Sequence, residues 1–313
     1  MNAKGTLSYF KNLPDGDRGN ISDTNVEKNI YKTILVAFDG SEFSKAALME
    51  SSIWIKRHGG KAILVYAVYF DEEEFSLAPG QREKRFELGR RACYETKGMV
   101  SSEFGIEVES LVCEGEQSDV IADIAREKKA DLVTIGTHGR KGLKKLIMGS
   151  VTSEVIINSP CDVLVVKTPC KCKGKYESIL VPFDGSDFSK KALNRACQLS
   201  TIDSAEITAL YVIPRYEEMI EFFKTSSVKE NLLQEAQRIL SGAEEIASEN
   251  GVHIKTKTEE GHAGDKIIET AGKLGTDLII MGIYGWRGIN KAIMGSVAER
   301  VIINASCPIL TVR

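Results

Sequence analysis

Apolar and polar positions along the chain predict strands that alternate with helices. Residues 33–38, Thr-Ile-Leu-Val-Ala-Phe, form an apolar run that predicts a buried strand. Gly40-Ser41 then leads into a segment whose apolar positions, from Phe43 to Trp54, recur at helical spacing. Further helices are predicted at 81–104, at 116–128 with Ser118 as the N-cap, and at 150–158. The strands predicted in this half lie at 33–38, 62–69, 106–112, 131–135 and 163–166.

The second half repeats this order of elements. Residues 216–250, between its second and third strands, form the longest segment that differs between the halves. Apolar strands separated by helices indicate a parallel sheet covered on both faces, because parallel neighbours need long crossover connections. The strands predicted here lie at 178–183, 206–212, 252–258, 277–281 and 309–312.

Two motifs occur twice and identify a tandem duplication. Gly136-x-x-Gly139, nine residues and Gly149-Ser150 reappear as Gly282-x-x-Gly285, nine residues and Gly295-Ser296. Phe38-Asp39-Gly40-Ser41 reappears as Phe183-Asp184-Gly185-Ser186. The offsets, 146 residues from 136 to 282 and 145 from 39 to 184, are of domain size, so each copy should fold alone. We predict a flexible extension at 1–30, domains at 31–168 and 176–313, and a linker at 169–175.

Both motifs fall where strands end, and the chemistry they suggest is anion binding. In doubly wound sheets ligands bind beyond the carboxyl ends of the strands. Glycines leave the backbone N–H groups at this edge of the sheet accessible to an anion. The helix that starts at Gly149-Ser150 has its N-terminus, the positive end of its dipole, at the same edge. Neither a dinucleotide fingerprint nor a P-loop is present at the required position. Two roles stay open for Ser150 and Ser296, a phosphate contact or a helix cap, and for Asp39 and Asp184, a cap or a carboxylate near a phosphate-bound cation.

The repeated Gly-x-x-Gly, nine residues, Gly-Ser pattern, with an Asp closing the first strand, resembles the ATP-binding class of the universal stress protein family. The resemblance covers about residues 31–313. It implies two Rossmann-like domains with five-stranded parallel sheets of order 3-2-1-4-5, paired through terminal strands as a pseudo-dimer within one chain, with a homodimer also possible. It implies ATP, with Mg²⁺, as the ligand. Carried over by position, the first site comprises Ala37, Asp39, Val68, Ile135, Gly136, Gly139, Gly149, Ser150 and Val151, and the second comprises Pro182, Asp184, Val212, Met281, Gly282, Gly285, Gly295, Ser296 and Val297.

The two loops depart from one another. The first carries Thr137, His138 and Arg140 where the second carries Ile283, Tyr284 and Trp286, so we rank the first site above the second. The family more often has Pro where Ala37 stands. His138 could act as a general base, but a lone loop histidine is more typical of a surface or phosphate contact. Tyr284 could stack on a ligand, but packing against the sister domain is the simpler interpretation.

Composition excludes several classes of protein. The net charge is −3 and charges of both signs are interspersed, so the chain has no positive electrostatic field that would attract nucleic acid. Residues 1–11 lack the apolar core of a signal peptide and no run is long enough to span a membrane, so we expect a cytoplasmic protein. The seven cysteines should be reduced. Cys170 and Cys172 could join a zinc site, but an exposed linker pair is favoured because two further ligands are not close in sequence.

These observations favour a nucleotide-binding regulator over an enzyme. ATP would serve as a switch or a structural ligand, would order residues 136–148 and 282–294, and would alter the surface offered to an unidentified protein partner. The rival interpretation is a slow ATPase or phosphoryl-transfer enzyme, which needs a positioned base and cationic stabilisation. No base recurs in both motifs, so we predict no catalytic residue and no residue dedicated to a metal.

Overall fold

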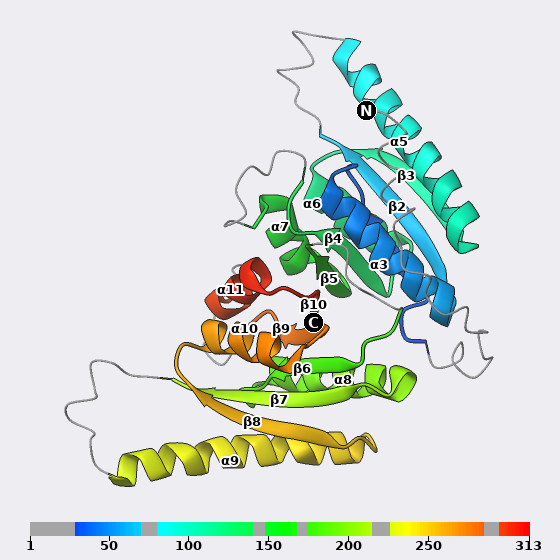
Figure 1. Ribbon diagram of the computed structural model, residues 1–313. Coiled ribbons are helices and arrows are strands. Elements are labelled where there is room, and N and C mark those ends of the chain that lie inside the picture. Colours follow the sequence, from blue (N-terminus) through cyan, green and yellow to red (C-terminus); the bar gives the residue numbers. More distant parts are fainter. Residues whose placement is uncertain (1–28, 70–79, 140–147, 168–173, 215–225, 285–293) are drawn as a thin grey trace.

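The computed structural model describes residues 29–69, 80–139, 148–167, 174–214, 226–284 and 294–313, which form two α/β domains built on one sheet (Figure 1). The first domain comprises β1 (Thr33–Ala37), α3 (Glu42–His58), β2 (Lys61–Val68), α5 (Gly80–Phe104), β3 (Glu107–Glu114), α6 (Gln117–Glu127), β4 (Leu132–Gly136), α7 (Ser150–Asn158) and β5 (Asp162–Val166). The second comprises β6 (Ser178–Pro182), α8 (Asp187–Asp203), β7 (Glu206–Ile213), α9 (Ser226–Glu249), β8 (Ile254–Glu260), α10 (Ala263–Leu274), β9 (Leu278–Gly282), α11 (Ser296–Asn304) and β10 (Ile309–Val312).

The strand order confirms the predicted fold in both halves. The sheet runs β3-β2-β1-β4-β5-β10-β9-β6-β7-β8, so each half has the order 3-2-1-4-5. Pairing is parallel within each half. Between the halves, β10 runs antiparallel to β5, with Leu310 opposite Leu164. The two halves therefore pair within one chain through their last strands, and a ten-stranded sheet results.

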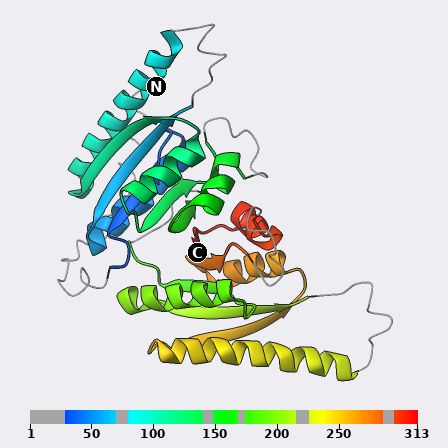
Figure 2. The ribbon, with the colours of Figure 1, turned by 180° about the vertical axis from the view of Figure 1, so that it is seen from behind.

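Helices cover both faces of this sheet, as the uninterrupted apolar strands require. Ile34 and Val36 of β1 belong to one buried cluster, whereas Leu35 and Ala37 belong to another, because successive side chains of a strand point to opposite faces. The first cluster packs under α3, α5, α8 and α9, and the second under α6, α7, α10 and α11 (Figures 1 and 2). Both clusters continue from one domain into the other, so the domains share a core.

The turn after the first strand of each half is built by the repeated Phe-Asp-Gly-Ser motif. Gly40 and its counterpart Gly185 have φ near +80°, at 80° and 79°, which favours glycine. Ser41 caps α3, since its side chain accepts a hydrogen bond from the Ser44 N–H at 3.2 Å. The Asp39 carboxylate instead accepts from the Ser41 N–H at 2.9 Å. The capping role left open for Asp39 thus belongs to Ser41, and Ser186 replaces Asp184 in the same way.

Ser118, predicted as a cap, and Ser150 and Ser296, for which a cap was one of two open roles, all lie inside helices. The N-cap of α6 is Glu116, and Ser118 lies inside the helix, where its hydroxyl donates to Glu154 of α7 at 2.7 Å. Gly149 and Gly295 occupy the N-cap positions of α7 and α11, so the serines that follow them are the first helical residues. No described side chain caps either helix.

The residues after β5 and β10 fasten the two domains to one another. Lys167 donates to the carbonyls of Ile303 and Ala305 at the end of α11. Arg313, its counterpart in the second copy, donates to the carbonyls of Ile157 and Ser159 at the end of α7. Cations placed at the carboxyl ends of helices meet unpaired carbonyls and the negative end of the helix dipole. Each domain thus caps the last helix of the other.

The described thiols are free, and two repeat-equivalent ones are shielded. Cys307 is buried and Cys161 half-buried, and burial raises the pKa of each thiol to about 11. Cys170 and Cys172 lie outside the described residues. Among the helices that the structure describes, none combines the length and apolarity needed to cross a membrane.

The second domain ends the sheet with a charged strand. Along β8, every side chain is exposed or half-buried, and none is buried. Lys255 pairs with Glu206 of the neighbouring β7 at 2.6 Å, and Lys257 pairs with Glu259 at 3.1 Å. The outer edge is therefore strongly polar.

Candidate functional site

A cavity of about 1030 Å³ opens at the carboxyl ends of β6, β7 and β9 in the second domain. The strands supply Pro182, Val212, Met281 and Gly282 to its wall. These strands are neighbours in the sheet. The helices after β6 and β7 cover one face and the helix after β9 covers the other, which is the arrangement that creates a crevice in doubly wound sheets. Its volume is at the upper end of the range of small-molecule sites.

The sequence motifs of the second copy converge on this cavity. Asp184 lines it after β6, and Gly295, Ser296 and Val297 line it at the start of α11. With the strand residues above, eight of the nine second-site residues named from sequence lie on its wall. The ninth, Gly285, lies outside the described residues, as do Trp286 and Arg140.

The start of α11 forms part of the cavity wall. The Gly295 N–H donates to the Ile283 carbonyl at 3.0 Å, which holds the helix entrance against the end of β9. The first-turn N–H groups of a helix have no intrahelical acceptor, and the helix dipole makes this end positive. Lys190 and Arg238 add cationic side chains to the wall, although Arg238 is also paired with Glu235 at 2.9 Å. The wall therefore combines groups that attract an anion with apolar side chains such as Val212 and Met281.

One wall was missed by sequence reasoning. Glu235, Arg238, Ile239 and Gly242 of α9 all line the cavity. They lie at intervals of three, one and three residues and thus on one helix face. This spacing was available from sequence, but residues 216–250 were treated only as a variable helical region.

In the first domain the structure brings the predicted residues to the equivalent edge. Ala37, Val68 and Gly136 are the last residues of β1, β2 and β4, and Ile135 precedes Gly136. Gly149, Ser150 and Val151 begin α7, which is held to β4 by hydrogen bonds from the Gly149 N–H to the Thr137 carbonyl at 3.1 Å and from Thr152 to the Gly136 carbonyl at 2.9 Å.

Asp39 and Gly139 meet at this edge. A Cβ added to Gly139 would lie 3.0 Å from Oδ2 of Asp39. The carboxylate therefore faces the Gly-x-x-Gly loop, where the sequence analysis placed the phosphates. A larger side chain at Gly139 would displace it.

Gly136 and Gly282 have a packing reason of their own. A Cβ at Gly136 would lie 2.6 Å from Cβ of Phe43, and one at Gly282 would lie 2.6 Å from Cβ of Phe188. The first turns of α3 and α8 therefore rest directly on these glycines. This close approach of helix to strand explains the glycines whether or not a ligand contacts them.

His138 is not the surface residue that was one of the two roles expected for it, and its contact with a phosphate stays a prediction. It is 8% exposed, its ring lies 5.3 Å from that of Phe43, and its Nδ1 is 3.1 Å from the Thr137 hydroxyl. It is therefore a packed residue and not a surface residue. Its counterpart Tyr284 packs on Phe188 in the same way, with ring centroids 5.2 Å apart. Tyr284 thus packs on a residue of its own domain, and it also lines the cavity.

The cavity of the second domain has the size of a small-molecule site. Across the described ranges, no group of three or more His, Cys, Asp or Glu side chains is arranged to hold a metal ion. Asp39 and Asp184 are the carboxylates that could lie near a Mg²⁺ ion bound to the phosphates of a ligand. A separate cavity between the domains measures only about 20 Å³ and is a packing gap.

Comparison with known proteins identifies the same unit twice. The profile of the Universal stress protein family matches residues 30–167 and 175–313. Universal stress protein MJ0531 of Methanocaldococcus jannaschii is 38% identical over 140 residues, which cover 44% of this chain and 82% of that protein. Universal stress protein YxiE of Bacillus subtilis is 31% identical over 148 residues, covering 44% of this chain and 99% of that protein. A universal stress protein structure from Archaeoglobus fulgidus DSM 4304 aligns with a TM-score of 0.71 at 18% identity, over 90% of this chain and 98% of that one, and so shares the fold.

Proposed function

Because the chain belongs to the universal stress protein family, we propose that each domain binds an adenine nucleotide, ATP with Mg²⁺, and that the protein acts as a stress-response regulator. The observation that carries the proposal is the cavity of about 1030 Å³ with eight predicted second-site residues on its wall. Its wall carries apolar strand residues as well as a helix N-terminus and two cationic side chains, which suits a ligand with both a base and phosphates.

The glycines at the helix entrances would admit the phosphates. Gly149 has φ −63° and ψ 142°, and Gly295 has φ −65° and ψ 138°, values that any residue adopts. The backbone conformation at either position allows a side chain. That side chain would, however, block the approach of the phosphates to the backbone N–H groups of the helix N-terminus. Gly149→Val and Gly295→Val should therefore block one site each without unfolding the chain.

Isothermal titration calorimetry with MgATP tests this directly. The unmodified protein should bind two equivalents, and each valine variant should bind one. Gly272→Val, which is on α10 with no atom within 4 Å of an added Cβ, is the matched control and should bind two. An absence of heat with ATP, ADP and AMP, together with no nucleotide in the purified protein, would refute the proposal.

The same preparation separates a regulator from an enzyme. His138, the histidine of the first glycine motif, packs on Phe43. Its counterpart in the second domain is Tyr284, which cannot serve as the same base. We therefore propose that the nucleotide is a switch or a structural ligand. Phosphate release at rates of about 1–100 s⁻¹, typical of kinases, and its loss in Asp39→Ala, would instead identify a phosphoryl-transfer enzyme.

A further inference from the structure

The joint between the domains has approximate two-fold symmetry. Leu164 of β5 lies opposite Leu310 of β10, and 146 residues separate these positions, the same offset that relates the two copies of the glycine motif. In such an isologous joint, a residue near the axis faces its own counterpart. If two identical domains were joined in this way, like residues would meet.

The axis of this joint is occupied by unlike residues. His58 ends α3 and Asp203 ends α8, and they are counterparts at an offset of 145 residues. His58 Nε2 lies 2.9 Å from Oδ1 of Asp203, and their side chains are 0% and 1% exposed. The ring of Trp54 stacks on His58 at 4.0 Å, and the Tyr176 N–H donates to Asp203 Oδ2 at 3.2 Å. A histidine and a carboxylate thus meet in full burial.

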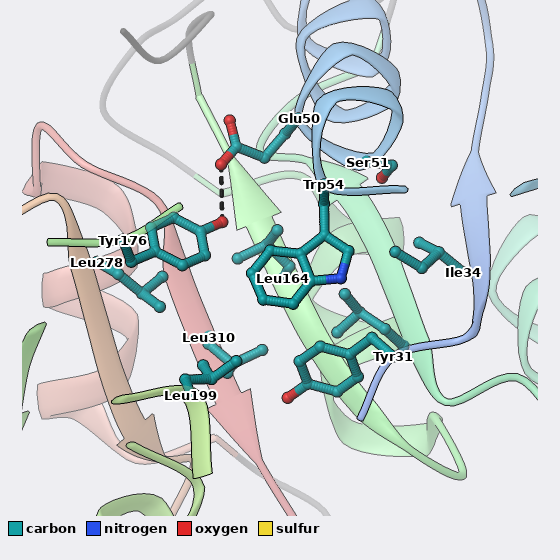
Figure 3. Close-up of a pocket in the computed structure, with 11 residues that line it drawn as sticks. Tyr31, Ile34, Glu50, Ser51, Trp54, Leu164, Tyr176, Leu199, Leu278 and Leu310 are labelled. Atoms are coloured by element: carbon teal, nitrogen blue, oxygen red, sulfur yellow. Dashed lines mark hydrogen bonds between the residues drawn. The ribbon is translucent and has the colours of Figure 1, made fainter. Parts of the chain in front are cut away.

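Glu50 and Arg195 are a second pair of unlike counterparts, at an offset of 145 residues. Each lies at one of two equivalent tyrosines of the opposite domain, Glu50 at Tyr176 and Arg195 at Tyr31. The Tyr176 hydroxyl donates to Glu50 at 2.7 Å, as Figure 3 shows. Tyr31 donates to Asp162 at 2.8 Å, and Arg195, the counterpart of Glu50, lies 5.6 Å from the Tyr31 ring and 2.6 Å from Asp162. An acid on one side of the axis is thus matched by a cation on the other.

We propose that these unlike counterparts make the joint selective, so that the pairing surface of the first domain fits a surface of second-domain type and rejects a second copy of itself. Two first domains would bring His58 against another His58, and Glu50 would stand in place of Arg195 beside Asp162. Two second domains would bury Asp203 against another Asp203. Uncompensated buried charge is the costly case for ion pairs. The joint therefore closes between the two halves of a chain and not between like halves of two chains.

The test uses the folded full chain, cut after folding. A protease site placed within residues 169–172 allows the linker to be cleaved, and native mass spectrometry over a dilution series then measures association of the two fragments. We expect one-to-one complexes of unlike fragments and no pairs of like fragments. His58→Asp and Asp203→His should each weaken association on the order of 100-fold. The exchange variant His58→Asp/Asp203→His should recover at least a tenfold part of that loss.

Matched controls make the same chemical changes away from the joint. His253→Asp and Asp187→His alter exposed residues of the second domain and should leave association unchanged. Circular dichroism of each uncut variant verifies folding. If the His58 variants fail to fold, Arg195→Glu gives an independent test, since it recreates the acid-on-acid contact of a like pair, and Arg195→Lys should restore association. Like pairs as abundant as unlike pairs, or an exchange variant no tighter than its single variants, would overturn the proposal.

Discussion

Gly136 offers a sharp test of whether a motif glycine serves the ligand or the fold. An added Cβ would lie 2.6 Å from Cβ of Phe43 and 2.7 Å from its carbonyl carbon. The first of these distances is 0.8 Å shorter than the 3.4 Å at which ordinary contact begins. Rotation of the Phe43 side chain cannot relieve it, because both atoms are fixed by the backbone. Gly136→Ala must therefore move the start of α3 away from β4.

The cost of such overpacking is about 1–3 kcal/mol. We expect Gly136→Ala to lower the free energy of unfolding by about 2 kcal/mol, which corresponds to roughly 6–10 °C in the melting temperature of a domain this size. Gly149→Ala is the control, because its added Cβ would approach only to 3.3 Å of the Thr137 carbonyl and its φ is unstrained. It should change stability by less than about 1 kcal/mol.

Differential scanning calorimetry of both variants without nucleotide measures the difference. Repeating the scans with MgATP separates binding from folding, since a bound ligand raises the melting temperature by mass action. Equal melting temperatures for Gly136→Ala and Gly149→Ala without nucleotide would refute the packing argument.

Two further predictions concern the cross-domain contacts and the thiols. Lys167→Met and Arg313→Met should each lower the free energy of unfolding by about 1 kcal/mol, because each leaves helix-end carbonyls of the other domain without a cation. Urea unfolding measures the loss, and Lys32→Met, at an exposed position, is the control. An equal loss in Lys32→Met would contradict the capping role. Burial raises the pKa of Cys161 and Cys307 to about 11. Both thiols should therefore resist iodoacetamide at pH 8 in the folded protein and react in urea, as measured by peptide mass spectrometry. Rapid labelling of the folded protein would contradict their burial.

The sequence was sufficient for the architecture because the apolar runs and the repeated motifs are local signals. All the predicted strands occur with boundaries shifted by two residues or fewer, and the strand order follows the family resemblance. Local signals failed where a side chain finds a distant partner. Ser118 resembles a cap, yet it donates to Glu154 of α7, and His138 resembles a surface residue, yet it packs on Phe43.

The candidate site was predicted in part for the same reason. Its strand ends and glycines carry motifs, and they converge on one edge. The α9 wall carries no motif, and its contribution depends on where a long helix lies across the sheet. The pairing of His58 with Asp203 could not be read from sequence either, because only the antiparallel joint of β5 and β10 shows which residues meet on the axis.

The union of β5 with β10 also determines how far the sheet can grow. Two separate domains would present four unpaired strand edges to solvent, whereas the described sheet presents two, at β3 and β8. Unpaired edges are the usual starting points of fibril formation, and lysines along an edge oppose it. The pairing of β5 with β10 thus removes two of the four edges at which polymerisation could begin, and the edge that remains at β8 carries Lys255 and Lys257.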